Sequence, residues 1–311
     1  MKKNKIAFLF PGQGSQTAGM GLDLIETSAL ASQRYRQAED ILGWSVEALS
    51  RPAGGGNLNL TLYTQPALYV HSCVLAEILM EAGLEPAITA GHSAGEYPAL
   101  TVNGAWDFAT GLKVIAERAR LMHESKKEGS MAAVLGMSGE EISDFCSSWK
   151  DGILSVAGLN SPKQTVITGE KAAVEKAAPL LKNRGAKKVI PIAVSAAFHS
   201  ALMQEAQSQF AEFLQAIEIK PPRIPLASNN TGQPVTDPEI IRVHLIKQFC
   251  EPVRWIDCMN AVSYVCSSAI EVGPGKVLCG LAKAIREDFP CHSASSWDGV
   301  RKVIEDYGLS S

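Results

Sequence analysis

The chain has 311 residues and is close to charge balance, with 29 Lys and Arg against 32 Asp and Glu. This balance gives no indication of a nucleic-acid partner, and the length allows one large α/β domain, with or without a smaller inserted one. The seven cysteines include no Cys-x-x-Cys pair, so we interpret them as buried thiols in a reducing compartment and predict no metal site.

The first residues are basic, and the apolar run 6–10 that follows them ends at Pro11. The run is too short for the apolar region of a signal peptide, and no run of about 18 apolar residues comes later, so we predict a soluble cytoplasmic protein with no membrane partner. The run is typical of a buried parallel strand, and the loop 11–16 then lies where open α/β sheets bind ligands. A phosphate cradle is an alternative for this loop, but its glycines lack the required spacing.

Residues 51–60 contain three consecutive glycines and predict a surface loop. After this loop, Thr64 as the N-cap and Pro66 in the first turn predict the start of a helix that ends near Gly83. His71 falls within this helix, and we interpret it as a structural residue.

A short apolar run at residues 86–90 leads into the sequence GHSAG at 91–95, and residues able to start a helix follow. This strand, turn and helix are the context of a Gly-x-Ser-x-Gly nucleophile elbow, because a turn that exposes a serine needs neighbours without Cβ atoms. The alternative is a turn whose serine caps the helix. We predict that Ser93 is a nucleophile, which still needs a base, an oxyanion hole and a substrate.

Residues 107–124 predict a helix with one apolar face. The apolar residues of this face are spaced by four, three, four and three positions: Phe108, Leu112, Ile115, Ala119 and Met122. Arg118 lies at the border of the face, about 80° from its centre at 100° per residue. An arginine at such a border usually extends over the surface, and it can equally place its guanidinium in a cleft beside the core.

From residue 130 to 194 the predicted elements follow the order strand, helix, strand, strand, helix, strand. The strands are predicted at 131–135, 153–157, 164–168 and 188–192, and the helices at 139–149 and 170–181. This is the order of a ferredoxin-like unit. We therefore predict an α/β fold in which a large hydrolase-like domain, residues 1–129 and 195–311, has a mostly parallel sheet flanked by helices and contains an inserted ferredoxin-like subdomain, residues 130–194.

The chain returns to the large domain near His199, which stands directly before a helix with an apolar face. A further helix at residues 238–249 is stopped by Pro252, and residues 269–272 predict the last buried strand. His199 therefore lies at a domain junction.

Ser93 needs a group that takes its proton, and a histidine is the most common such group. His199 fits best, because it follows Ser93 in chain order, as the base does in α/β hydrolases. The weaker candidates lie in predicted helices or near the C-terminus: His71, His123, His244 and His292. No acidic residue between Ser93 and His199 takes a recognisable position after a strand of the main sheet, so we expect a neutral partner. Carbonyls at a helix end lack intrahelical donors, and one near Gln248 can accept the Nδ1 proton of the histidine.

An oxyanion hole needs backbone N–H groups. Ala94, directly after the nucleophile, supplies one candidate, and Gln13 in the loop after the first strand is the obvious second. Arg118, if it faces this site, offers a planar fork for a carboxylate. A serine acyl-transfer site that contains an arginine indicates an acyl group with a free carboxyl end.

Several recognisable segments occur in order along almost the whole chain. They are FPGQGSQ at residues 10–16, TQPAL at 64–68, GHSAGEY at 91–97, Arg118 in its helix, NSP at 160–162, AFH at 197–199, Gln248, and EVGPGK at 271–276. Together they resemble the malonyl-CoA:acyl carrier protein transacylases and the acyltransferase domains of polyketide synthases. Because the match extends over so much of the chain, it is specific at the level of the family.

The resemblance implies that malonyl-CoA acylates Ser93, with His199 as general base and acid and Arg118 paired with the malonyl carboxylate. It also implies supporting roles: backbone N–H groups of Gln13 and Ala94 in the oxyanion hole, the main-chain carbonyl of Gln248 orienting the histidine, and His92 beside the arginine. The phosphopantetheine thiol of a separate acyl carrier protein then takes the malonyl group, for fatty-acid or polyketide synthesis. The substrate is a coenzyme A thioester, and no bound cofactor is expected.

Two residues depart from the pattern of the family. Ala94 stands where malonyl-type members usually carry a larger aliphatic residue, so we expect a wider pocket. Pro98 removes an N–H from the first turns of the helix behind the nucleophile, and we expect it to tilt that helix. The AFH sequence before the base and the retained Arg118 resemble malonyl-selective members, and both favour malonyl as the acyl group.

Three other functions are compatible with parts of this pattern. An editing acyl hydrolase that acts on carrier proteins would leave Arg118 unpaired when it holds an uncharged acyl chain. An acyltransferase for a substituted malonyl or other acyl unit would fit a wider pocket at Ala94. A non-catalytic docking module for carrier proteins would need neither Ser93 nor His199.

Overall fold

The computed structural model describes residues 5–52, 56–125, 127–194 and 196–309. The strands of its larger sheet are β1 (Ile6–Phe10), β2 (Pro86–Gly91), β7 (Leu226–Ala227), β8 (Pro234–Val235), β9 (Ser268–Val272) and β10 (Cys291–Ala294). They lie in the order β10-β9-β1-β2-β7-β8. Every neighbouring pair is parallel except β7 with β8, so the predicted mostly parallel α/β sheet is confirmed.

Strand β1 is buried on both faces, which explains its continuous apolar run. Phe8 and Phe10 pack into one hydrophobic core, and Ala7 and Leu9 pack into a second core on the opposite face of the sheet. Successive strand residues point to opposite faces, so a strand between two helical layers needs apolar residues at every position.

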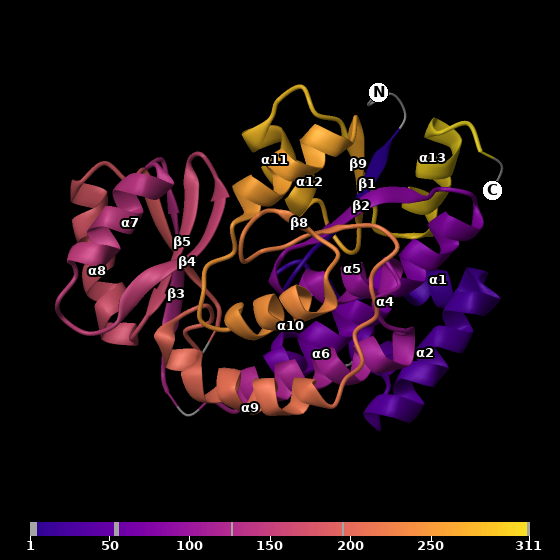
Figure 1. The fold of residues 1–311 in the computed structure, drawn as a ribbon, viewed down its shortest axis with the longest axis horizontal. Helices are drawn as coiled ribbons and strands as arrows, with labels where there is room; N and C mark the ends of the chain where they lie inside the picture. The colour runs from indigo at the N-terminus through magenta and orange to yellow at the C-terminus, as the bar shows by residue number, and fades with distance from the viewer. Residues whose placement is uncertain (1–4, 53–55, 126, 195, 310–311) are drawn as a thin grey trace.

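Helices cover both faces of this sheet (Figure 1). Around the first core lie α1 (Leu22–Thr27), α2 (Ala29–Leu42), α3 (Val46–Ser50), α4 (Thr61–Glu81), α5 (Glu96–Val102), α6 (Phe108–His123), α9 (Gln204–Gln215), α10 (Pro238–Lys247) and α13 (Trp297–Asp306), with the short 3-10 helices η2 (Gly56–Asn59), η3 (Ser93–Gly95) and η4 (Ala201–Met203). The second core is closed by α11 (Trp255–Val265) and α12 (Val277–Ile285). Across the described part of the chain, none of the helices has the length and apolar character needed to cross a membrane.

Helix α4 starts one turn earlier than the sequence indicated. Its first residue is Thr61, and Thr64 lies inside it, where its hydroxyl donates to the carbonyls of Leu58 and Leu60. Pro66 is an interior residue. The helix tolerates this proline because one missing N–H removes a single backbone bond, while nearly the whole length of α4 is buried and stabilised by packing. In the predicted loop before it, residues 53–55 lie outside the described residues, and η2 follows.

Helix α6 matches its prediction closely. It runs from Phe108 to His123, and the carboxylate of Asp107 caps its start by accepting the N–H of Thr110 at 2.7 Å. All five residues of the predicted apolar face are buried. Helix α10 ends at Lys247, two residues before its predicted end, and Gln248 is its C-cap.

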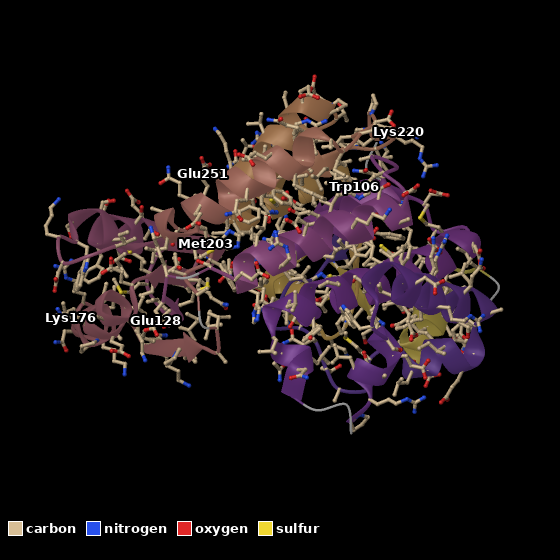
Figure 2. The ribbon with its side chains drawn as sticks, turned by 90° about the horizontal axis from the view of Figure 1, so that it is seen from below. Trp106, Glu128, Lys176, Met203, Lys220 and Glu251 are labelled. Atoms are coloured by element: carbon tan, nitrogen blue, oxygen red, sulfur yellow. The ribbon has the colours of Figure 1, made fainter. Side chains whose placement is uncertain are left out.

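A second, antiparallel sheet lies beside the first (Figure 1). Its strands are β3 (Ser130–Leu135), β4 (Leu154–Ser161), β5 (Gln164–Gly169) and β6 (Lys188–Ile192), in the order β4-β5-β3-β6, with α7 (Gly139–Ser148) and α8 (Lys171–Asn183) packed on one face. The order of elements along the chain is the predicted one, while the limits of an inserted subdomain at 130 and 194 stay a prediction. Figure 2 shows Lys176 of α8 at the outer end of the part of the molecule that contains this smaller sheet, far from Lys220, which follows α9.

The strands that the sequence did not indicate are short or lie at the edge of the larger sheet. Strands β7 and β8 have two residues each, and β10 has the sequence Cys-His-Ser-Ala. None of the three offers a continuous apolar run or a clear alternation, which are the patterns that identify a strand. Their pairing is therefore decided by neighbouring strands.

Backbone hydrogen bonds join the smaller sheet to the loop between α10 and α11. The N–H of Leu159 on β4 donates to the carbonyl of Val253 at 2.9 Å, and the N–H of Val253 donates to the carbonyl of Ala157 at 2.9 Å. This connection fixes one wall of the cavity that lies between the two sheets.

Candidate active site

A cavity of about 540 Å³ lies between the two sheets. Most of its lining comes from the loop after β1, the turn after β2, the face of the smaller sheet, the segment before η4, and α12. Single residues of η2, α4, α6 and the loop between α10 and α11 complete it. Ser93 and His199 are both in this lining. The carboxyl ends of β1 and β2 point toward the cavity, as expected for a ligand site of a parallel sheet.

The turn after β2 holds Ser93 in an unusual backbone conformation. Its φ is 53°, in the left-handed region that residues with a Cβ rarely adopt. Gly91 and Gly95 make the turn possible: a Cβ on Gly91 would lie 1.9 Å from the carbonyl carbon of Gly95, and one on Gly95 would lie 2.0 Å from the carbonyl oxygen of Phe10. The sharp turn exposes the serine side chain to the cavity, which is the geometry of a nucleophile elbow.

The side chains of Ser93 and His199 meet across 106 positions of sequence, with 2.9 Å between Oγ and Nε2. Nδ1 of the imidazole lies 2.7 Å from the carbonyl oxygen of Gln248 and 3.2 Å from that of Glu251. Because both of these partners only accept, Nδ1 carries the proton and Nε2 is free to accept one from Ser93. Burial, and next the positive charge of Arg118, lower the pKa of His199 to about 3, so the imidazole is neutral at pH 7.

Arg118 is fully buried, with 0% of its side chain exposed. Its Nη1 donates to Gln65 Oε1 at 2.7 Å, and its Nη2 donates to Gln248 Oε1 at 2.8 Å and to Ser93 Oγ at 3.0 Å. Nε has no hydrogen-bond partner among the described residues, and burial lowers the pKa of the guanidinium. Of the two alternatives that the helix border left open, the structure therefore selects the cleft, where a buried cation lies beside the candidate nucleophile.

Gln13 and Ala94 lie on two segments that touch. A Cβ on Gly12 would be 2.3 Å from the carbonyl oxygen of His92 and 3.8 Å from the nitrogen of Ala94, so the loop after β1 runs directly against the turn after β2. The side chain of Gln13 is held by Thr61, whose Oγ1 accepts from Nε2 at 3.0 Å. Two backbone N–H groups on adjacent turns are the arrangement that an oxyanion hole requires.

The wider pocket and the tilted helix that we expect from Ala94 and Pro98 stay predictions, and the structure shows where the two residues lie. Ala94 is 4% exposed and packs into the first core, and it is not among the residues that line the cavity. Pro98 is the third residue of α5, within the first turn, where N–H groups have no intrahelical partner. Its missing N–H therefore costs α5 no internal hydrogen bond.

His92 connects the turn after β2 to the smaller sheet. Its Nε2 lies 2.9 Å from Asn160 Oδ1 on β4, and its ring packs against Trp255 with 5.4 Å between the centroids. The side chains that hold Arg118 are Gln65, Gln248 and Ser93. The structure thus brings together Ser93, His199, Arg118 and Gln248 by direct hydrogen bonds, and His92 lies next to them as a link to β4.

Three residues of this site were not identified from the sequence. Gln65 is part of the hydrogen-bonded surroundings of Arg118, as described above. Asn229 follows β7, and its Oδ1 accepts the N–H of Ser93 at 2.7 Å while its Nδ2 donates to the carbonyl of Gly91 at 2.6 Å. Glu96, three residues after Ser93, bonds to Asn229 and Gln248. A polar residue directly after a parallel strand is a usable signal, but β7 is too short to be seen in the sequence.

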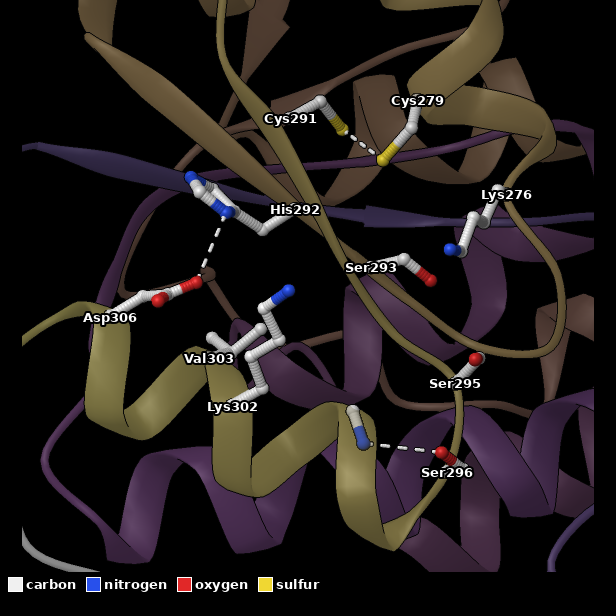
Figure 3. Close-up of a pocket in the computed structure, with 11 residues that line it drawn as sticks. Lys276, Cys279, Cys291, His292, Ser293, Ser295, Ser296, Lys302, Val303 and Asp306 are labelled. Carbon is white, nitrogen blue, oxygen red and sulfur yellow. Dashed lines mark hydrogen bonds and ion pairs between the residues drawn. The ribbon is translucent and has the colours of Figure 1, made fainter.

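A second cavity of about 370 Å³ lies beside α12, between β10 and α13 (Figure 3). Its candidate nucleophiles are occupied: Cys279 donates to Cys291 with 2.7 Å between the sulfurs, and the hydroxyl of Ser293 donates to the carbonyl of Gly275. The hydrogen bond with Cys279 and burial raise the pKa of Cys291. The imidazole of His292 lies 3.7 Å from Asp306. Of the two cavities, the one between the sheets is therefore the candidate active site.

Comparisons with known proteins agree with one another. Residues 7–294 match the family model described as the acyl transferase domain. A protein of Haemophilus influenzae named malonyl CoA-acyl carrier protein transacylase is 39% identical over 307 residues, which cover 97% of this chain and 98% of that protein. The crystal structure of an acyl carrier protein S-malonyltransferase from Vibrio cholerae has a TM-score of 0.93 at 38% identity and covers 96% of this chain and 100% of its own. A malonyl-transacylase in complex with its type II polyketide synthase acyl carrier protein has a TM-score of 0.94 at 35% identity, with 97% and 100% coverage.

Proposed function

This chain belongs to the acyl transferase domain family, and from that premise we propose that it transfers a malonyl group from malonyl-CoA to the phosphopantetheine thiol of an acyl carrier protein. The relatives named above as malonyl transacylases support this assignment over nearly the full length of both chains. The transferred unit serves fatty-acid or polyketide synthesis, since one of the similar structures was solved with a polyketide synthase carrier protein.

The observation that carries the proposal is the position of Arg118. Its guanidinium is buried 3.0 Å from the oxygen of Ser93, and none of the ion pairs among the described residues includes it. A malonyl thioester carries a carboxylate two bonds from the carbonyl carbon that the serine attacks. The arginine is therefore placed to pair with that carboxylate while the thioester carbonyl lies at Ser93.

In the first half-reaction the Ser93 hydroxyl gives its proton to His199 Nε2, and Oγ forms a bond to the thioester carbonyl carbon. The negative charge on the carbonyl oxygen is stabilised by the N–H groups of Gln13 and Ala94. The carbonyls of Gln248 and Glu251 accept from Nδ1 and stabilise the imidazolium. The carbon–sulfur bond then breaks, the coenzyme A sulfur takes the proton from Nε2, and malonyl-Ser93 remains.

In the second half-reaction the carrier thiol gives its proton to His199 and attacks the ester carbonyl of malonyl-Ser93. The bond between the carbonyl carbon and Oγ breaks, and Oγ recovers the proton from Nε2. The imidazole of His199 is neutral at pH 7, so its Nε2 can accept a proton at the start of each half-reaction.

Radiolabelled malonyl-CoA and acetyl-CoA test the proposal. We expect malonyl-CoA to give a stable labelled protein that transfers its label to a carrier protein bearing phosphopantetheine, and not to the same carrier without it. Ser93→Ala should abolish the labelling. Rapid loss of the label to water, or a preference for acetyl-CoA, would contradict the proposal and favour an editing hydrolase.

A further inference from the structure

Glu96 is a buried acid at the centre of the site, with 1% of its surface exposed. It lies in the first turn of α5, and its two carboxylate oxygens accept from two distant segments. Oε1 accepts the backbone N–H of Asn229 at 2.7 Å, and Oε2 accepts from Nε2 of Gln248. Among the described residues no lysine or arginine forms an ion pair with it. Its function is therefore to be sought in these two hydrogen bonds.

The two partners of Glu96 contact different reacting groups: Asn229 contacts the turn that carries Ser93, and Gln248 contacts His199 and Arg118. Asn229 supports the nucleophile, because its side chain accepts from the N–H of Ser93 and donates to the carbonyl of Gly91, on either side of the turn. Gln248 supports the base and the cation: its carbonyl accepts from Nδ1 of His199, and its Oε1 accepts from Arg118. Glu96 is thus the bridge between these two sets of contacts.

The chemistry of an amide makes this bridge directional. The guanidinium of Arg118 only donates, so Gln248 must turn its Oε1 to Arg118 and its NH₂ group to Glu96, whose two oxygens both accept. With the amide flipped, the NH₂ group would face the donors of Arg118, and the hydrogen bond to Oε2 of Glu96 would be lost. The orientation of Gln248 is therefore determined from both ends: Arg118 needs Oε1 on its side, and on the other side the NH₂ group donates to Glu96 and to the carbonyl of Ser93 at 3.3 Å.

We propose that Glu96 is a positioning residue, which fixes the amide of Gln248 and the backbone of Asn229 so that Arg118, His199 and Ser93 keep their mutual geometry. It takes the place of the acidic third member that the site otherwise lacks, but it acts on the group that orients the histidine and not on the histidine itself. For the selection of a carboxylated acyl group the inference rests on the proposed function, whereas the reactivity of Ser93 tests it independently.

The surroundings of Glu96 make its hydrogen bonds necessary. Burial raises the pKa of Glu96, and the pKa is about 8 even though the hydrogen bonds from Asn229 and Gln248 and the charge of Arg118 act to lower it. The other titratable groups near it are Tyr97 on the same helix and Cys258 on α11, and both have a raised pKa because they are buried. A carboxyl group in such a place is tolerated only when both of its oxygens have hydrogen-bond partners.

The variant Glu96→Gln tests the proposal, because it keeps the size of the side chain and replaces one acceptor by a donor. The new NH₂ group must face either the N–H of Asn229 or the NH₂ of Gln248. We expect the rate at which a fluorophosphonate labels Ser93 to fall roughly 5- to 150-fold, the factor that corresponds to the free-energy cost of one unpaired buried donor. The ratio of malonyl to acetyl transfer should fall as well, because Arg118 loses its orientation.

Glu271→Gln is the matched control. Glu271 is also buried, and its carboxylate accepts the N–H groups of Leu278 at 3.0 Å and Cys279 at 2.8 Å at the start of α12. This helix lines the cavity, but among the described residues Glu271 makes no hydrogen bond to Ser93, His199, Arg118 or Gln248. This variant should lower the Tm, because it loses the same kind of hydrogen bond as Glu96→Gln. Its rate of labelling should stay within about twofold of the wild-type rate. A purely structural role for Glu96 predicts the same behaviour for Glu96→Gln, and that result would overturn the proposal.

A double-mutant cycle shows whether Glu96 acts through Gln248. Gln248→Met removes the amide and keeps the main-chain carbonyl that accepts from His199. In this background we expect Glu96→Gln to have much less effect on the malonyl-to-acetyl ratio than in the wild type. Full additivity of the two variants would contradict the proposed route. If the wild type shows no preference for malonyl-CoA, the proposed function fails, and the fluorophosphonate comparison still decides the position of Glu96.

Discussion

Arg118 brings a full positive charge into the interior, where its hydrogen-bond partners are the oxygens of two amides and one hydroxyl. The rings of Tyr97 and Phe249 lie 5.4 and 5.6 Å from the guanidinium carbon and exclude water around it. A cation in this setting gains most from an anion that enters with the substrate, because neutral partners offset its lost hydration incompletely. The residue therefore favours acyl groups that carry a carboxylate.

Arg118→Ala should remove this preference. We expect kcat/KM for malonyl-CoA to fall by about 30- to 1000-fold, equivalent to about 2 to 4 kcal/mol for a buried charge-assisted pair, while kcat/KM for acetyl-CoA falls less than about tenfold. The control is Arg120→Ala on the same helix, whose side chain pairs with Glu117 and Glu124 at the surface. Steady-state acylation with both substrates measures the effect, and an equal loss on both would argue against pairing with the carboxylate.

At the scale of single elements, the turn between β2 and α5 depends on backbone contacts at two glycines that are so close that a Cβ atom would not fit. Gly95 lies against the backbone of Phe10 on β1, and Gly91 lies against Gly95 itself. Ser93 keeps its left-handed backbone because Asn229 holds the turn on both sides: its Oδ1 accepts the N–H of Ser93, and its Nδ2 donates to the carbonyl of Gly91. The elbow is thus stabilised jointly by β1, β2 and the segment after β7.

A pair of glycine substitutions separates this close approach from ordinary helix propensity. Gly95→Ala would place a Cβ 2.0 Å from the carbonyl oxygen of Phe10, so we expect a loss of at least about 3 kcal/mol in the free energy of unfolding and loss of acylation. Gly280→Ala lies within α12 with open space around the new Cβ, and it should gain about 0.5 to 1 kcal/mol. Urea unfolding of both variants measures the expected decrease and the expected increase in the free energy of unfolding. A stable and active Gly95→Ala variant would show that the turn can move away from β1 to admit a side chain.

At the scale of the whole molecule, folding favours the neutral form of several histidines, because burial lowers the pKa of His71, His92, His199 and His244. Burial lowers the pKa of His71 to about 4 and that of His199 to about 3. In the unfolded chain both groups bind a proton near pH 6.5, so between that pH and the lower folded values the unfolded state binds more protons. The stability of the fold therefore rises with pH in this window and is lost as the pH falls.

The acid sensitivity can be assigned by substitution. We expect the free energy of unfolding to fall by up to about 1.4 kcal/mol per pH unit for each of the two groups as the pH drops from 6.5 toward 4. His71→Asn keeps an acceptor near the hydroxyl of Tyr35, which lies 3.3 Å from Nδ1 of His71, and removes one titrating group. Urea unfolding at pH 7, 6 and 5 should show a shallower slope for the variant, and an unchanged slope would exclude His71 as a source.

Local patterns in the sequence determined much of this protein. The strand β1, the helix α6 and the order of strands and helices from β3 to β6 follow from apolar periodicity and turn residues, because these signals depend on neighbours within a few positions. The glycines around Ser93 and the placement of His199 before a helix are local signals too, and they led to the two residues whose side chains meet in the structure.

The tertiary structure decided what depends on packing between distant segments. The sequence places Arg118 at the border between the apolar and polar faces of its helix. Its side chain lies in the site because Gln65 of α4 and Gln248 at the end of α10 accept its hydrogen bonds there. Asn229 reaches Ser93 across 136 positions, and Glu96 reaches Gln248 across 152, through a strand of two residues and a helix end that carry no periodic pattern. Short-range periodicity specifies elements, whereas the direction of a buried polar side chain is fixed by the partners that folding brings to it.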